Sequence, residues 1–311
     1  MMSDPPATAR RGQPTAARAK IAHIAVGVSA YPEGHDAAAL GAALARATGA
    51  DLMLIAVLSD PLVIPSAGMT WKSLRKDAQA TLAQISDQVM PDARVVVRTD
   101  VSVARGLRRV VAREHRDLLV VGSSHKATEG SVRIGKRVRQ LIGYAGCGLA
   151  IAPRGIHNRA NIPFRRIGVG YEGRPESEAA LSLAASIALA AKAQLHVCGV
   201  VDDRSKSARW SKGAAAALQP ELDDRAHAEL ELLRERALTA AHSLDPSARV
   251  DVRRGRPADV LLDLCADVDL LVIGSRHWGA AARLLLGSTG ESLAYHATCP
   301  ILIVPRAQDA T

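Results

Sequence analysis

The sequence predicts an α/β protein of two tandem domains, each with a doubly wound, mostly parallel sheet. Apolar runs alternate with helical patterns along the chain, an order typical of strand–helix–strand units. The second half also repeats the first at a constant offset of 152 residues, which pairs Gly122 with Gly274, His125 with His277, Gly135 with Gly287, Cys147 with Cys299 and Pro153 with Pro305. Because this repeat is far longer than a solenoid module, each copy is expected to be a domain.

Length and composition suit two such domains. A chain of 311 residues with 48% hydrophobic residues can bury two cores. Aromatic residues are only 3%, so the cores should consist of Val, Ile, Leu and Ala. Residues 1–20, rich in Pro, Ala and Arg, are expected to form a disordered tail. The domains are placed at 21–153 and 164–306, with a linker at 154–163.

Domain 1 begins with an apolar strand and an alanine-rich helix that ends before Gly49, a residue typical of helix C-termini. The next helix is indicated by apolar residues spaced three or four apart from Leu74 to Val89. The expected strands are 21–28, 52–58, 94–97, 118–121 and 149–152, and the expected helices are 36–48, 74–89, 101–115 and about 135–144.

Domain 2 repeats this order. Its first helix begins at Arg174-Pro175-Glu176, where proline and an acid suit the first turn. A long polar loop is expected at 202–220. The expected strands are 167–171, 195–201, 250–252, 270–273 and 301–304, and the expected helices are 174–191, 222–241, 258–266 and one that begins at Ser288.

Right-handed crossovers between parallel strands give each domain a Rossmann-like strand order of 3-2-1-4-5. The strand order reverses between the first and fourth strands, so a ligand is expected outside their carboxyl ends. The fifth strands, 149–152 and 301–304, are apolar edges without a protecting charge. We expect the two domains to meet through these strands across a pseudo-two-fold axis.

Charge and cysteine content exclude several classes of protein. The net charge of +9 attracts polyanions, but no helix-turn-helix, RRM or zinc-finger pattern accompanies it, so specific nucleic-acid binding is not expected. The four cysteines lack metal-ligand spacing and should be buried free thiols in a reducing compartment. No apolar run is long enough to span a membrane, and the N-terminus lacks a secretory signal pattern. A cytoplasmic location is expected.

The loop after each fourth strand carries the most informative motif. Domain 2 has Gly274, then His277, then nine residues before Gly287-Ser288, and domain 1 has the same spacing from Gly122 to Gly135-Lys136. With the duplication and the cysteine before each last strand, this resembles the universal stress protein family over nearly the whole chain. Nucleotide-binding members of that family carry G-x2-G-x9-G-(S/T) at this place. Here the second glycine is histidine in both halves, and the final Ser/Thr is Lys136 in domain 1.

The resemblance implies a site for ATP with magnesium, and favours domain 2 over domain 1. In domain 2, Glu172 would face the ribose or a metal, Val200 and Ile273 would flank the adenine, and the phosphates would be held by Gly274, Arg276, His277, Gly287, Ser288 and Thr289. In domain 1 the acid is replaced by Ser29, a poor cation ligand. The corresponding domain 1 residues are Gly122, His125, Gly135 and Lys136.

Each of these features also has a structural interpretation. Gly274 and Gly287 could serve a tight turn instead of a phosphate. Ser288 to Glu291 reads as a capping box, which can coexist with an anion at the helix N-terminus. His125 and His277 could keep a glycine-like backbone with positive φ, and their imidazoles could either crowd or bind the phosphates.

The function expected from the sequence is therefore stress-response binding or regulation by a tandem universal stress protein, with an adenine nucleotide as its ligand. The alternative is an interaction module of the same family that binds a protein partner and no nucleotide. Neither histidine has a nucleophile and an orienting acid at a recognisable spacing, so no catalytic residue is assigned. An ATP-hydrolysing enzyme would need a positioned general base, which the sequence pattern does not identify. Further assembly into a homodimer stays open.

Overall fold

The computed structural model describes residues 20–29, 31–59, 70–142, 147–159, 162–202, 219–277 and 284–305, without the side chains of 219–222, 276–277 and 284–285. The expected tail at 1–20 therefore lies outside the described residues, apart from Lys20, as does most of the loop expected at 202–220.

Domain 1 contains five parallel strands with helices between them. The strands are β1 (His23–Gly27), β2 (Asp51–Ser59), β3 (Arg94–Asp100), β4 (Leu118–Gly122) and β5 (Gly148–Ala152). The helices are α1 (Pro32–Thr48), α2 (Trp71–Val89), α3 (Val103–Arg113) and α4 (Lys136–Ile142), and a 3-10 turn, η1 (Ile156–Asn158), follows β5.

Domain 2 repeats this order of elements. Its strands are β6 (Arg166–Tyr171), β7 (Gln194–Val201), β8 (Arg249–Arg254), β9 (Leu270–Gly274) and β12 (Ile301–Val304), and its helices are α5 (Pro175–Ala191), α8 (Gln219–Leu244), α9 (Pro257–Leu264) and α10 (Ser288–His296). The loop after β9 contains a small antiparallel pair, β10 (Arg276–His277) with β11 (Leu284–Leu285), which the sequence pattern did not predict.

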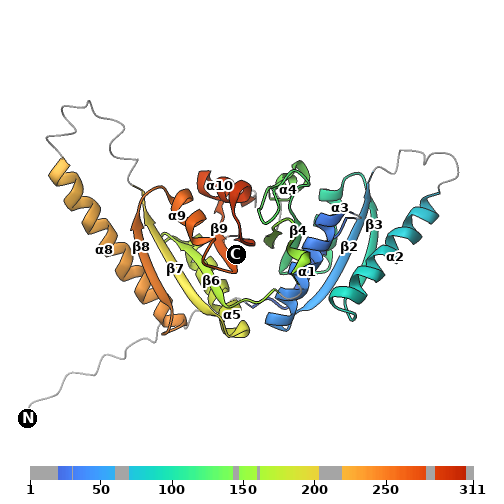
Figure 1. Cartoon of the computed structure of the whole chain (residues 1–311), viewed down its shortest axis with the longest axis horizontal. Helices are drawn as coiled ribbons and strands as arrows, with labels where there is room; N and C mark the ends of the chain where they lie inside the picture. Colours follow the sequence, from blue (N-terminus) through green and yellow to red (C-terminus); the bar gives the residue numbers. More distant parts are fainter. Residues whose placement is uncertain are drawn as a thin grey trace, which may run out of the picture.

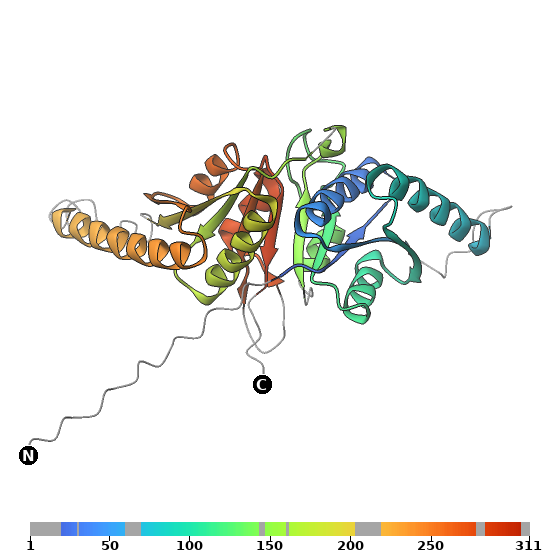
Figure 2. The ribbon, with the colours of Figure 1, turned by 90° about the horizontal axis from the view of Figure 1, so that it is seen from below.

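The ten long strands form one continuous sheet in the order β3-β2-β1-β4-β5-β12-β9-β6-β7-β8. The predicted order 3-2-1-4-5 is therefore confirmed in both domains. The fifth strands pair antiparallel, with Leu302 opposite Ala150 and Ile303 opposite Leu149. All four residues are fully buried. The expectation that the two apolar edges protect each other is confirmed, and the domains lie side by side in Figures 1 and 2.

Two apolar layers cover the two faces of this sheet and cross the domain boundary. One contains side chains of α1, α2, α5 and α8, and the other contains those of α3, α4, α9 and α10. Val, Ile, Leu and Ala dominate both layers, as the composition predicted. The four cysteines are buried and unpaired. Among the described helices, none is long and apolar enough to cross a membrane.

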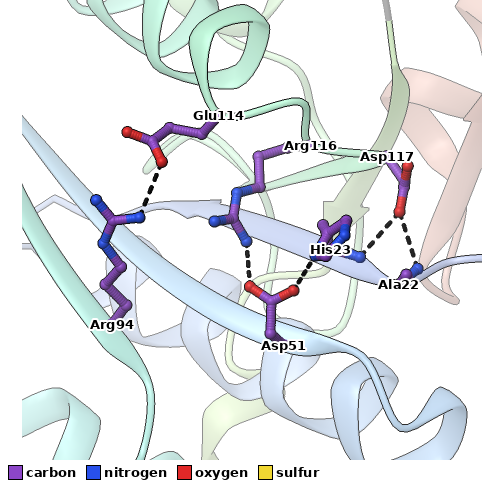
Figure 3. Close-up of polar contacts among 7 residues, drawn as sticks. All are labelled: Ala22, His23, Asp51, Arg94, Glu114, Arg116 and Asp117. Carbon is purple, nitrogen blue, oxygen red and sulfur yellow. Dashed lines mark hydrogen bonds and ion pairs between the residues drawn. The ribbon is translucent and has the colours of Figure 1, made fainter.

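The amino ends of the strands in domain 1 are tied together by charged side chains (Figure 3). The carboxylate of Asp117 accepts hydrogen bonds from the backbone nitrogens of Ala22 and His23, at 2.8 and 2.9 Å. Asp269, which lies 152 residues later, accepts in the same way from Arg165 and Arg166, at 2.7 and 2.9 Å. The duplication therefore extends to this contact, at the end of the sheet opposite to the expected ligand site.

Asp51, at the start of β2, bonds His23 of β1 and Arg116, which lies just before β4 (Figure 3). Partial burial alone would raise the pKa of Asp51, but the hydrogen bonds from His23 and Arg116 outweigh it and hold the pKa below the ordinary 3.8. A carboxyl with a lowered folded-state pKa stabilises the fold above its unfolded pKa, and this contribution is lost as the pH falls through the folded value.

Asp51→Asn is therefore expected to lower the melting temperature near pH 6 and to make progressively less difference as the pH falls below about 3.8. Melting curves of both proteins between pH 2 and 7 test this expectation. Asp92→Asn, at an exposed turn position, is the matched control. A difference between Asp51→Asn and the original protein that stays constant over this range would contradict it.

Candidate functional site

A cavity of about 900 Å³ opens at the carboxyl ends of β1, β2 and β4 in domain 1. The ends of these strands contribute Ser29, Val57 and Gly122 to its wall. The first and fourth strands are neighbours in the sheet, and the crossovers leave them in opposite directions. The cavity therefore lies at the point where the strand order reverses, where open α/β sheets bind their ligands.

One wall of this cavity is apolar and another is polar. The apolar residues include Ile55, Val57, Val103 and Leu107, from β2 and α3. Basic and neutral polar residues lie on the loops after β4 and β5 and at the start of α4, and they include Ser124, His125, Lys136, Arg137 and Arg154. Three acids also line the cavity, Glu33 and Asp36 from α1 and Glu129 from the loop after β4. Such a division suits a ligand with a flat apolar part and an anionic part.

Close packing requires glycine at some positions of the motif and not at others. A Cβ on Gly122 would lie 2.0 Å from the carbonyl oxygen of Glu33, and one on Gly274 would lie 2.4 Å from that of Glu176. The first turns of α1 and α5 therefore require glycine at these two positions, independently of any phosphate. A Cβ on Gly135 would meet only Ser124, at 3.6 Å, so close packing does not explain that glycine.

His125 lines the domain 1 cavity and is exposed. The expected positive φ is not found there, because His115 and Lys192 are the only non-glycine residues with positive φ in the described part of the chain. Its carbonyl oxygen accepts a hydrogen bond from Nη1 of Arg154, at 2.9 Å. The loop after β4 is thus held by a residue from beyond β5, and a glycine-like backbone is not needed.

The segment after β5, which the sequence suggested was only a linker, forms part of the cavity wall. Arg154, Gly155, His157 and Asn158 all line it. Asp36 of α1 is fully buried and accepts hydrogen bonds from the backbone nitrogens of Gly155 and His157, at 3.0 and 3.1 Å. The only sequence signal was an aspartate within an alanine-rich helix, and its partners lie 119 and 121 residues away.

Residues of domain 2 also hold the loop between β4 and α4 of domain 1 in place. The backbone nitrogens of Val132 and Ile134 donate to the carbonyl oxygens of Ala297 and Ala294, at 2.7 and 2.9 Å. Arg139 of α4 bonds the hydroxyl of Tyr295 on α10. These contacts join α4 and the loop before it to α10. The two helices lie close together in Figure 1.

The corresponding cavity in domain 2 has about 110 Å³ within the described residues. Six of the residues suggested by the sequence line it, namely Glu172, Val200, Ile273, Gly274, Gly287 and Thr289. Glu172 lies 3.8 Å from Arg174 in an ion pair. Arg276 and His277 form β10, but their side chains lie outside the described part, and so do residues 278–283 of the same loop.

The capping box predicted for Ser288 is not formed. The N-cap of α10 is Gly287, and no side chain caps the helix. Ser288 is therefore the first helical residue, is exposed, and is not among the residues that line the domain 2 cavity.

Two side chains of the domain 2 cavity, Cys198 and Tyr171, are weak nucleophiles. Burial raises the pKa of the Cys198 thiol to about 11. Burial and the hydrogen bond to Glu178 raise the pKa of Tyr171 as well. Both side chains are therefore protonated at neutral pH. No cluster of three His, Cys, Asp or Glu side chains that could hold a metal ion occurs among the residues that the structure describes.

The universal stress protein family model matches the chain twice, over residues 20–153 and 163–305. The chain belongs to the universal stress protein family. A universal stress protein of Mycolicibacterium smegmatis is 26% identical over 294 residues, which cover 90% of this chain and 96% of the relative.

Solved structures of universal stress proteins share the fold of the whole chain. One from Archaeoglobus fulgidus has a TM-score of 0.63 at 14% identity and covers 92% of this chain and 98% of its own. A putative universal stress protein from Pseudomonas aeruginosa has a TM-score of 0.61 at 16% identity, with 91% and 93% covered. The tandem universal stress protein architecture expected from the sequence is thus confirmed.

Proposed function

We propose that this universal stress protein binds an adenine nucleotide as a regulatory ligand, and that the cavity of domain 1 is its principal site. The observation that carries the proposal is the cavity of about 900 Å³ at the reversal point of the domain 1 sheet. Sites for small molecules and cofactors in proteins typically have about 300–1,000 Å³. The family resemblance of the loop between Gly122 and Gly135 supports a nucleotide as the ligand.

The two walls of the cavity favour one orientation of the nucleotide. The adenine would pack on Val57, Val103 and Leu107, and the phosphates would lie toward His125, Gly135 and Lys136. Lys136 and Arg137 add positive charge at the cavity, which attracts phosphate. Ser29 offers no carboxylate for a cation, and no group of three possible metal ligands occurs among the described residues, so magnesium would bind mainly through the phosphates.

Domain 2 remains a predicted second site. The sequence favoured it because Glu172 and Ser288 match the family pattern better than their counterparts in domain 1. Its described cavity, of about 110 Å³, is below the usual volume of a nucleotide site. Residues 278–283, which belong to the same loop, lie outside the described chain, so the roles of Arg276, His277 and Thr289 stay predictions.

Calorimetric titration with Mg-ATP tests the proposal, with Gly135→Val and Gly287→Val as a matched pair at equivalent positions of the two domains. Gly135 lines the cavity, and a Cβ there would meet only the Ser124 side chain, at 3.6 Å. We expect binding in the micromolar range that falls at least about tenfold in Gly135→Val, a loss of about 1.4 kcal/mol, and persists in Gly287→Val.

Binding that is lost in Gly287→Val and persists in Gly135→Val would indicate that the site is in domain 2. No heat in the original protein at millimolar Mg-ATP would contradict nucleotide binding. That outcome would favour the alternative, an interaction module that binds a protein partner.

A further inference from the structure

Asp36 and His157 form a buried acid–imidazole pair at the domain 1 cavity. The Asp36 side chain has no exposed surface, and its carboxylate lies 2.5 Å from Nδ1 of His157. The same carboxylate accepts the backbone N–H groups of Gly155 and His157. A buried carboxylate is unfavourable unless its oxygens are hydrogen-bonded, and these three donors meet that requirement.

This arrangement fixes the tautomer and the orientation of the imidazole. Because Nδ1–H donates to Asp36, the lone pair of the neutral ring is on Nε2. Nε2 has no hydrogen-bond partner among the described residues, and the His157 side chain is 31% exposed and lines the cavity. The ring of His35, 5.9 Å from that of His157 between centroids, packs beside it. A carboxylate that orients an imidazole in this way leaves Nε2 as a proton acceptor.

The segment that carries His157 contacts the loop after β4, which would hold the phosphates of the proposed nucleotide. Arg154, three residues before His157, donates from Nη1 to the carbonyl oxygens of His125 and Ala127, at 2.9 and 2.8 Å. Its backbone also exchanges hydrogen bonds with Gly130 and Ser131, at 2.9 and 3.1 Å. The segment that carries His157 and the loop after β4 therefore close the same end of the cavity.

Only domain 1 has the acid of this pair. Alignment of Pro32 of α1 with Pro175 of α5 places Ala179 at the position of Asp36. Two of the three hydrogen bonds to Asp36 come from backbone nitrogens, which are sufficient to anchor the segment after β5. The imidazole provides the third hydrogen bond through Nδ1 and leaves Nε2 available in the cavity wall.

We propose that His157, oriented by Asp36, is the general base for hydrolysis of the terminal phosphoanhydride of a nucleoside triphosphate bound in the domain 1 cavity, an inference that rests on the proposed nucleotide site. Nε2 takes a proton from a water molecule while the water oxygen forms a bond to the terminal phosphorus. The bond from that phosphorus to the bridging oxygen breaks, and its electron pair leaves with the nucleoside diphosphate. The imidazolium then releases the proton to solvent. His157 is the catalytic residue, and Asp36 is a positioning residue.

The test measures phosphate release from Mg-ATP by the full chain, together with calorimetric binding of the non-hydrolysable β,γ-imido analogue. In His157→Asn we expect kcat to fall about 100-fold or more, the usual contribution of a general base, while the KM, the dissociation constant of the analogue and the melting temperature change little. His115→Asn, exposed and outside the cavity, is the control and should keep the original kcat; its φ of 47° is one that asparagine tolerates.

Asp36→Asn tests the positioning role. Its amide has a single oxygen, which can accept from only one of the two backbone nitrogens. With that oxygen toward Gly155, the amide presents N–H to Nδ1 of His157, which moves the imidazole proton to Nε2 and removes the base. We expect kcat to fall at least about tenfold with an unchanged KM, whereas a merely structural role would lower the melting temperature and analogue affinity and leave kcat intact. If Asp36→Asn does not fold, His157→Asn alone decides.

Four results would overturn the inference. Phosphate release by His157→Asn at the original rate would exclude the general base, and a loss of analogue binding in that variant would make His157 a binding residue. Analogue binding without phosphate release by the original protein would exclude hydrolysis and leave the nucleotide site intact. No analogue binding at all would overturn both proposals.

Discussion

Leu302→Ala should lower the free energy of unfolding of the whole chain by about 2–5 kcal/mol, the usual effect of truncating a fully buried leucine. Leu302 has no exposed surface and lies in β12, between β9 of its own domain and β5 of the other. Its side chain belongs to the apolar layer that continues from α1 to α5. The substitution therefore opens a cavity shared by both domains.

Because both apolar layers cross the junction, we expect the original protein and Leu302→Ala to unfold in one cooperative transition. Denaturant titration followed by circular dichroism measures the change in free energy, and agreement between calorimetric and van't Hoff enthalpies tests the single transition. Leu189→Ala is the matched control, because Leu189 is 64% exposed and should change stability by less than about 0.5 kcal/mol. Two separate transitions, with only the later one shifted, would show that the domains unfold independently.

Gly122→Ala should destabilise the fold by about 1–3 kcal/mol, as overpacking does, and should also reduce nucleotide affinity. The new methyl group would lie 2.0 Å from the carbonyl oxygen of Glu33, so the first turn of α1 must move away from β4. Gly34, in the same turn, is similarly close to Ser29. A Cβ on Gly34 would lie 2.1 Å from the carbonyl oxygen of Ser29. Because Ser29, Glu33 and Gly122 all line the cavity, this movement changes its shape.

Thermal unfolding and calorimetric titration of Gly122→Ala test the two effects together. Gly135→Ala is the matched control for stability, since its Cβ makes an ordinary contact with Ser124, at 3.6 Å. We expect Gly135→Ala to melt within a few degrees of the original protein. Equal stability of Gly122→Ala and Gly135→Ala would mean that α1 adjusts freely and that Gly122 has another role.

The sequence pattern predicted the fold well because the information is local and repeated. Each buried strand is a short apolar run, each helix has an apolar face, and the constant offset of 152 residues identifies the duplication. The pairing of β5 with β12 followed from a simple argument about two uncharged edges. The small pair β10–β11 was missed because a two-residue strand leaves no periodic signal.

The candidate site was harder to predict because its geometry depends on distant contacts. The motif spacing placed Gly122, Gly135 and His125 at the loop after β4, but spacing alone does not reveal that Gly122 is required by the turn at Glu33. Asp36 and His157 are 121 residues apart, and no local pattern joins them. The cavity volumes, which favour domain 1, depend on side-chain packing in the whole domain and have no counterpart in a motif.

The pairing of β5 with β12 has a further consequence because both strands belong to one polypeptide. The short linker between the two domains, at 154–163, keeps the two edges at a local concentration on the order of millimolar, the range given by short tethers. Two separate single-domain chains with the same contact would come apart on dilution. In this protein the paired state is independent of the protein concentration, so it persists when few copies are present in the cell.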